Sequence, residues 1–237
     1  AVIHFAGLKS VSESVRDPIK YWDVNVCGTK NLLEVMNKYK CFSIVFRSSA
    51  TVYGLSESVP ISEDQKVSPI NPYGNTKWSI EKMLYDLYKS DISQWKICSL
   101  RYFNPIGAHP SGLIGEDPIG IPNNIFPLIT QIAIGRISSL DVYGDDWDTI
   151  DGSGVRDYIH VVDLVEGHIA ALEFLRSKDS CYEIINLGSG SGYSVFEMIR
   201  EFENSTGCNI PYKIASRREG DIAKSFADIS KAIKLLG

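Results

Sequence analysis

The first hundred residues alternate between short continuous apolar runs and longer segments with helically spaced apolar positions. The apolar runs predict buried strands over 2–5, 42–46 and 95–102. The segments between them predict one or two helices over 17–40 and a helix over 72–90, which has a proline early in its first turn. This βαβα order predicts an α/β fold built on a parallel, doubly wound sheet.

The composition of the sequence changes near residue 105, since glycine and proline are frequent from there to residue 122. We place a domain boundary at this point and expect a smaller α+β substrate domain after it. The pattern predicts short strands over 140–143, 157–160 and 183–187, and helices over 124–135, 163–177 and 194–206.

Both ends of the chain fall inside predicted elements. The chain opens in the apolar stretch Ala1–Gly7 without an initiator methionine, and it stops at Leu235-Leu236-Gly237, where a helix ends without a tail. We therefore expect the 237 residues to be a piece of a longer protein.

The composition is that of an ordinary globular protein, with 44% apolar residues, 22% charged residues and a net charge of −5. An acidic balance disfavours nucleic acid or an anionic membrane as the main partner. Five scattered cysteines without a CxxC pair favour a reducing compartment, and no apolar run approaches the roughly 20 residues that span a bilayer. We expect a cytoplasmic protein that binds neither nucleic acid nor membrane.

Small and polar residues follow the three predicted strands of the first half. These are Ala6-Gly7, Ser48-Ser49 and Phe103-Asn104. Because ligands of parallel doubly wound sheets bind outside the carboxyl ends of the strands, the sequence predicts one ligand crevice there.

The sharpest chemical feature is the segment Tyr73-Gly74-Asn75-Thr76-Lys77 at the start of the predicted helix 72–90. A tyrosine and a lysine four residues apart share one face of a helix. A nearby ammonium favours the phenolate form of a tyrosine, which makes the phenol a usable base. Ser49 could hydrogen-bond between this phenol and a substrate hydroxyl. The alternative is a surface helix on which the two side chains meet incidentally.

Several motifs, in order along nearly the whole chain, resemble the extended short-chain dehydrogenase/reductase family, and within it the members that epimerise UDP-sugars. They are His4–Lys9, Ser48–Gly54, Pro72–Lys77, Leu100–Pro105, Gly120–Asn124, Gly154–Val161 and Arg217–Asp221.

The resemblance implies a Rossmann-like sheet whose first strand, Gly-rich phosphate loop and helix would precede residue 1. Residues 1–105 would then be the remainder of an NAD-binding domain. Residues 106–237 would be mainly a nucleotide-sugar-binding domain, some strands of which can return to the sheet. The implied reaction interconverts UDP-galactose and UDP-glucose by reversible oxidation at sugar C4, through a 4-keto sugar, with tightly bound NAD.

The resemblance also implies roles for individual residues. Tyr73 would be the base for the sugar 4-hydroxyl, Lys77 would hold the nicotinamide ribose, and Ser49 would bridge Tyr73 and substrate. Positions lining NAD, besides these three, are Phe5, Ala6, Gly7, Lys9, Asn25, Tyr102 and Phe103. Positions around UDP are Asn104, Asn124, Ile125, Tyr143, Arg156, Arg218 and Asp221. Arginine forks bind phosphate oxygens in pairs, which suits the pyrophosphate.

The family also contains dehydratases, which carry an Asp-Glu pair after the strand-end threonine to protonate a leaving hydroxyl. Here Thr51 is followed by Val52-Tyr53, which favours epimerisation over elimination. Arg47 stands where the family usually has a further serine, and it either disturbs the cofactor pocket or turns into solvent. Ser225 stands at or beside a position where some members have a bulky tyrosine, so UDP-N-acetylhexosamines are also expected to fit.

Three other patterns are interpreted as structural. Gly188–Gly192 follows a strand, but the dinucleotide-loop spacing would need glycine where Tyr193 stands, so we expect a tight turn. The aspartates of 145–151 fail the calcium-loop pattern at Ile150 and predict a solvated acidic loop. The four histidines lack metal-site spacing, so no metal is expected.

Two functional hypotheses from different classes remain at this point. The first is the NAD-dependent epimerase, and the second is a relative that binds nucleotide without turnover, which Arg47 keeps open. The resemblance further implies a homodimer that pairs helices near 17–39 and 73–90 with their twofold mates.

Overall fold

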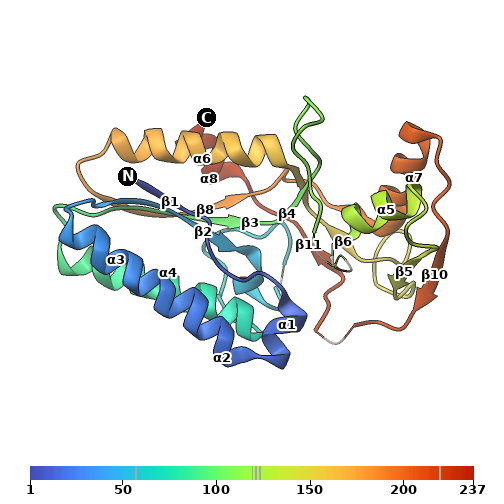
Figure 1. Cartoon of the computed structure of the whole chain (residues 1–237), viewed down its shortest axis with the longest axis horizontal. Helices are drawn as coiled ribbons and strands as arrows, with labels where there is room; N and C mark the ends of the chain where they lie inside the picture. Colours follow the sequence, from blue (N-terminus) through green and yellow to red (C-terminus); the bar gives the residue numbers. More distant parts are fainter. Residues whose placement is uncertain (57, 119, 121, 123, 219) are drawn as a thin grey trace.

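A four-stranded parallel sheet forms the centre of the larger lobe of the molecule, in the strand order β1-β2-β3-β8 (Figure 1). Its strands are β1 (Val2–His4), β2 (Ser43–Ser49), β3 (Lys96–Tyr102) and β8 (Cys181–Leu187). This computed structural model describes residues 1–56, 58–118, 120, 122, 124–218 and 220–237. The topology confirms the predicted parallel, doubly wound sheet, and the strand expected over 183–187 returns to it as β8.

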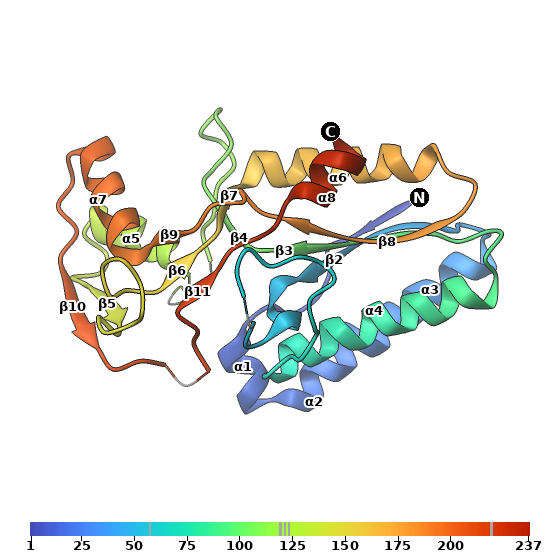
Figure 2. The same ribbon diagram turned by 180° about the vertical axis from the view of Figure 1, so that it is seen from behind.

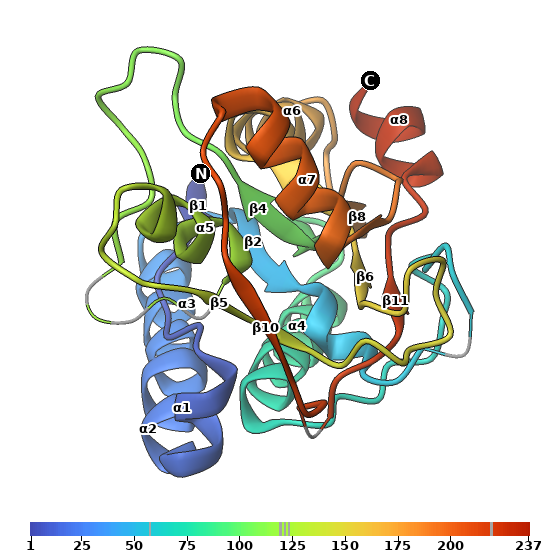
Figure 3. The same ribbon diagram turned by 90° about the vertical axis from the view of Figure 1, so that its right-hand side faces the viewer.

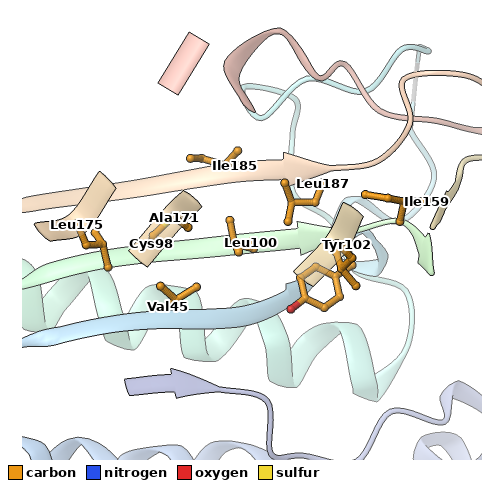
Figure 4. Close-up of a cluster of buried hydrophobic side chains, with 10 residues drawn as sticks. Val45, Cys98, Leu100, Tyr102, Ile159, Ala171, Leu175, Ile185 and Leu187 are labelled. Atoms are coloured by element: carbon orange, nitrogen blue, oxygen red, sulfur yellow. The ribbon is translucent and has the colours of Figure 1, made fainter. Parts of the chain in front are cut away.

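Helices cover both faces of this sheet (Figures 1 and 2). On one face lie α3 (Gly28–Lys38) and α4 (Pro72–Ser90), and on the other lie α6 (Val161–Arg176) and α8 (Ser230–Leu236). The alternation of side chains along β2 explains both cores, because Ile44 and Phe46 face α3 and α4 while Val45 faces α6. Figure 4 shows the second core, in which side chains of β2, β3 and β8 meet Ala171 and Leu175 of α6.

The segment before α3 forms three short helical elements, whereas the sequence predicted one or two helices over 17–40. Its elements are α1 (Val11–Arg16), α2 (Pro18–Tyr21) and the π-helical turn η1 (Trp22–Cys27). The sequence pattern missed α1, which is short and is capped by the Ser10 side chain accepting from the amide of Glu13. The strand β2 runs to Ser49, beyond the predicted end at residue 46. The 3₁₀ turn η2 (Ala50–Tyr53) follows it.

The smaller lobe is built around its own apolar core, which joins α5, α7 and β5 (Figure 3). The remaining elements are β4 (Asn104–Ile106), α5 (Ile125–Ala133), β5 (Leu140–Tyr143), β6 (Val155–Arg156), β7 (Tyr158–His160), β9 (Tyr193–Ser194), α7 (Val195–Thr206), β10 (Tyr212–Ala215) and β11 (Lys224–Ser225). Short pairings β5–β10, β6–β9, β6–β11 and β4–β7 connect them. The division into two domains at residue 105 stays a prediction.

Over the described residues, no helix is long and apolar enough to cross a membrane.

A buried ion pair ties α4 to the sheet. The guanidinium of Arg101 on β3 donates to both carboxylate oxygens of Glu81, at 3.0 and 2.6 Å, and both side chains are at most 1% exposed. The hydroxyl of Ser48 on β2 donates to the same carboxylate. One glutamate of α4 thereby holds β2 and β3 at a fixed position relative to the helix.

We predict that Arg101→Met lowers the free energy of unfolding by about 3–5 kcal/mol, because it leaves the Glu81 carboxylate buried without its partner. Denaturant titration of the whole natural protein measures the loss. The matched control is Arg136→Met, at an exposed arginine of the smaller lobe, which should be close to neutral. An equal loss in both variants would show that the buried pair has no special role.

Candidate active site

The carboxyl ends of β1, β2 and β3 lie at one edge of the sheet, as the sequence predicted. Parallel pairing aligns His4 with Phe46, and Ser49 with Tyr102, so the residues that follow these positions project from the same edge. Phe5–Gly7, η2 and Phe103 therefore lie at the edge where the sequence predicts the ligand crevice, and the first turn of α4 packs against η2 there.

The chain after β1 approaches α4 through bare backbone. Gly7 has a φ of +146°, and a Cβ built there would lie 2.9 Å from the Asn25 Oδ1 and 3.7 Å from the Lys77 Nζ. The Asn25 side chain is buried in η1 and binds both backbone groups of Leu8, accepting from its amide at 2.8 Å and donating to its carbonyl at 3.1 Å. Asn25 also donates to the Thr76 hydroxyl at 3.2 Å. A side chain at position 7 would break this arrangement.

These residues fit a dinucleotide. Phe5, Ala6 and Gly7 line a cavity of about 510 Å³ between β1 and the helices that follow it, together with Val2, Ile3, His4, Val24, Gly28 and Leu32. The Phe5 side chain is 49% exposed at the end of β1, whereas the Cβ side of Gly7 is filled by Asn25. Lys9, further along, is exposed and forms an ion pair with Glu116 at 3.8 Å.

Tyr73 and Lys77 lie on the buried face of α4, as their spacing predicted. The helix begins where Asn71 caps it, accepting from the amide of Gly74 at 2.8 Å, and Pro72 occupies the first helical turn. The amide of Tyr73, which the helix leaves free, donates to the Ser14 hydroxyl of α1 at 3.1 Å. Two hydrogen bonds and a proline in the first turn therefore fix the position of Tyr73.

Lys77 is 1% exposed and lies among mostly apolar groups. Its Nζ donates to the Arg47 carbonyl at 3.0 Å, and it lies 4.9 Å from the Phe46 ring centre and 5.9 Å from that of Tyr73. Burial and, to a smaller extent, the Arg47 guanidinium lower the pKa of Lys77 to about 7, although the Glu81 carboxylate acts in the opposite direction. Lys77 can thus change charge near neutral pH.

Ser49 ends β2 at the same edge, but its hydrogen-bond partner is Thr51. Its hydroxyl donates to the Thr51 hydroxyl at 2.9 Å and accepts from the Thr51 amide at 3.2 Å. Gly74 is in close contact with Thr51, since a Cβ there would lie 3.0 Å from the Thr51 carbonyl oxygen. The structure therefore brings Ser49 and the first turn of α4 together through η2.

Tyr102 and Phe103 close the crevice at the end of β3. The buried hydroxyl of Tyr102 bonds to His168 of α6, whose ring also lies 4.7 Å from that of Phe5. The Arg47 guanidinium lies 5.5 Å from the Tyr102 ring centre, so this side chain stays at the crevice instead of turning into solvent.

The predicted UDP residues gather where β6, β11 and the smaller lobe meet. Arg156 binds Asp221 at 3.2 Å, and the Arg218 guanidinium stacks 3.7 Å from the Tyr143 ring centre. The Asn104 side-chain amide donates to the Asp157 carbonyl at 3.0 Å. The N-cap position of α5 is Asn124, and Ile125 is its first helical residue. Of the motif positions quoted above, Ile121, Asn123 and Glu219 lie outside the described residues.

The sequence analysis missed Asp157, which organises this side of the site. Its buried carboxylate accepts from the amides of Ser189, Gly190 and Ala227 at 2.6, 3.2 and 3.0 Å. The glycine-rich turn after β8 therefore wraps an aspartate, in line with its predicted structural role. Asp157 belongs to a motif that carried the resemblance, but only a long-range fold reveals its partners.

The acidic loop also has a structural use, because Asp146 pairs with Arg217 at 2.8 Å. Among the residues the structure describes, no group of three or more His, Cys, Asp or Glu side chains is placed to hold a metal ion.

The titration of Lys77 should be visible in the stability of the protein. The ordinary pKa of lysine is 10.5 and that of Lys77 is about 7, so the unfolded state binds more protons than the folded state between these values. The free energy of unfolding therefore rises with pH across this window. We predict that Lys77→Met removes this part of the rise in denaturant titrations, whereas Lys82→Met, at an exposed position of α4, keeps it. A native-like profile for Lys77→Met would contradict the prediction.

Comparison with known proteins agrees with this geometry. Residues 1–188 match the model of the NAD dependent epimerase/dehydratase family. The UDP-glucose 4-epimerase of Bacillus subtilis (strain 168) is 55% identical over 237 residues, which cover 100% of this chain and 69% of that protein.

Two crystal structures share the fold. The UDP-glucose-4-epimerase from Stenotrophomonas maltophila, solved with bound NAD and formylated UDP-arabinopyranose, is 48% identical, with a TM-score of 0.97 and coverage of 100% of this chain and 70% of that one. The UDP-glucose 4-epimerase from Bifidobacterium longum, in complex with NAD+ and UDP, is 52% identical, with a TM-score of 0.94 and the same coverage. The chain belongs to the NAD dependent epimerase/dehydratase family.

Proposed function

We propose that this chain carries the catalytic residues of an isomerase, an NAD-dependent 4-epimerase that interconverts UDP-galactose and UDP-glucose. The observation that carries the proposal is the pair of Tyr73 and Lys77 beside the bare backbone of Gly7, at the carboxyl edge of a parallel sheet. The 55% identity to the Bacillus subtilis enzyme over the whole chain supports the same activity.

The residues of the crevice divide the work between them. Tyr73 takes the proton of the sugar 4-hydroxyl, and Ser49 hydrogen-bonds to that hydroxyl to hold it against the phenol. The Lys77 ammonium holds the nicotinamide ribose and favours the phenolate. NAD, when bound along Phe5–Gly7, supplies reversible oxidation at sugar C4. The protein holds the 4-keto sugar while its opposite face turns toward the cofactor, so that C4 is reduced from that face and Tyr73 returns its proton to the C4 oxygen.

The smaller lobe supplies the anchor for UDP. Arg156 and Arg218 bring two planar cations to the region, and forks of this kind suit a pyrophosphate. Asp221 holds Arg156, and Asn104 lies at the junction of the two lobes.

Epimerisation is favoured over dehydration by the residues after Thr51. Val52 and Tyr53 are both buried, and the Tyr53 hydroxyl is occupied by the Asn186 side chain at 2.7 Å. These positions offer no acid to protonate a leaving hydroxyl, so elimination lacks its proton donor.

Ser225 bears on the choice of sugar. It lies on β11 beside Arg156 of β6, and its carbonyl accepts from the amide of Asp157 at 2.9 Å. A small side chain at this position leaves room for an N-acetyl group. We therefore propose that UDP-N-acetylglucosamine and UDP-N-acetylgalactosamine are also substrates.

The cellular setting and the assembly are proposed from the cysteines and from exposed apolar side chains. The five cysteines are free, which suits a reducing compartment such as the cytoplasm. Exposed apolar side chains on the helices near the N-terminus and on α4, among them Ile19, Val35 and Tyr85, favour a homodimer through these helices.

We predict that Tyr73→Phe in the whole natural protein lowers turnover of UDP-galactose by about 10²–10⁴-fold, the usual contribution of a general base. NAD retention should stay native, since the ring is kept. The matched control, Tyr85→Phe at an exposed position of the same helix, should leave turnover unchanged. An unchanged rate in Tyr73→Phe would remove Tyr73 as the base. No turnover in the native protein would favour a nucleotide binder without catalysis.

For the second sugar class, we predict measurable turnover of UDP-N-acetylgalactosamine at saturation. Ser225→Tyr should lower that turnover by about 10–200-fold, the range for a steric change in a pocket, while UDP-galactose is still converted. Chromatography of the nucleotide sugars measures both. An active native enzyme that leaves UDP-N-acetylgalactosamine untouched would refute the proposal.

A further inference from the structure

Arg47 touches the catalytic machinery through two different groups. It lies on β2, two residues before Ser49. Its carbonyl oxygen accepts the 3.0 Å hydrogen bond from the Lys77 Nζ. Its guanidinium lies 5.5 Å from the ring centre of Tyr102, and within the described part of the chain its side chain forms no ion pair with a carboxylate.

The platform under this guanidinium is fixed. Figure 4 shows Tyr102 at the carboxyl end of β3, beside the end of β2. The His168 Nδ1 lies 2.7 Å from the Leu164 carbonyl, which can only accept, so Nδ1 carries the proton and Nε2 accepts from the Tyr102 hydroxyl. The aromatic ring on which the Arg47 cation rests therefore has one orientation.

Few other charges act on Lys77. From α4 itself, Glu81 favours the ammonium, while the Tyr73 ring lies 5.9 Å away. From β1, His4 has a lowered pKa, mainly through burial and also through Lys77, which favours its neutral form. From α2, Tyr21 meets the ring of Tyr73. The charged groups that act on Lys77 are therefore Arg47 and Glu81, and Glu81 is already paired with Arg101.

We propose that Arg47 is a positioning residue that acts through Lys77: its carbonyl oxygen holds the Lys77 amine at the end of β2, and its guanidinium, beside the Tyr102 ring, places a second positive charge at the same strand end, where Lys77 assists Tyr73. The link to Tyr73 rests on the proposed function, but the effect on Lys77 does not. A serine at position 47 would keep the carbonyl contact and remove the opposing cation.

The consequence is a shift in one direction. Without the guanidinium, Lys77 keeps its proton to higher pH. Removing a like charge from the surroundings of a buried amine favours its protonated form, and we expect a rise of about one pH unit in the titration midpoint of Lys77. The alkaline limit of turnover should move upward by the same amount, because the ammonium persists.

The experiment follows the Lys77 amine directly by NMR of the whole natural protein with ¹⁵N-labelled lysine side chains, using Lys77→Met to identify the signal. We expect the titration midpoint to rise by about one pH unit in Arg47→Ser and in Arg47→Gln, and to stay native in Arg47→Lys, which restores the charge. Arg176→Ser, at an exposed position of α6, is the matched control. Two uncharged variants are used so that, if one misfolds, the other still tests the effect of the charge.

Equal midpoints in the native protein and in either folded uncharged variant would overturn the inference. So would a shift in Arg47→Lys as large as that in Arg47→Ser, because it would indicate lost packing. The pH profile of UDP-galactose turnover is recorded in parallel. A native protein without turnover would defeat the proposed function, while the NMR midpoints would still decide the role of Arg47.

Discussion

The buried carboxylate of Glu81 is the contact on which the site depends. It belongs to α4, but its partners are Arg101 of β3 and Ser48 of β2, so the helix cannot slide along the sheet without exposing a charge to an apolar interior. Tyr73 and Lys77 lie on the same helix, within two and a half turns of Glu81, and Ser49 directly follows Ser48. The ion pair between Glu81 and Arg101 therefore sets the distance between Tyr73 and the end of β2.

A second constraint works at the other side of the crevice. The chain leaving β1 has no regular structure, and Asn25 holds it by binding both the amide and the carbonyl of Leu8. The amide side chain can do this only because Gly7 lacks a Cβ. A π-helical turn carries Asn25, and such turns replace regular helix where a side chain must be re-aimed. The path of the chain after β1 thus rests on a glycine and an asparagine whose dependence on each other is steric.

The sequence predicted the elements whose signals are local and left out those whose causes are distant. The helix 72–90 matches α4 because Asn71 and Pro72 mark its start in the sequence itself. The strand over 95–102 likewise needs only its apolar run. By contrast, nothing in the local sequence distinguishes Ser48 from Ser49. Ser48 faces Glu81 and Ser49 faces the crevice only because β2 continues to Ser49 and its side chains alternate between the two faces. The partners of Asp157 lie on three segments that only the folded chain brings together.

The return of β8 to the sheet has a consequence for how the molecule is made. β3 and β8 are neighbours in the sheet, yet the elements from β4 to β7 and the helix α6 are synthesised between them. Until β8 arrives, β3 presents an unpaired edge next to a largely apolar face, and long-range parallel pairing of this kind is slow. The strand that completes the sheet also delivers the glycine turn that wraps Asp157. Folding around Asp157 is thereby coupled to closure of the sheet, so nascent chains halted before residue 181 would be exposed to aggregation and would lack the turn that holds Asp157.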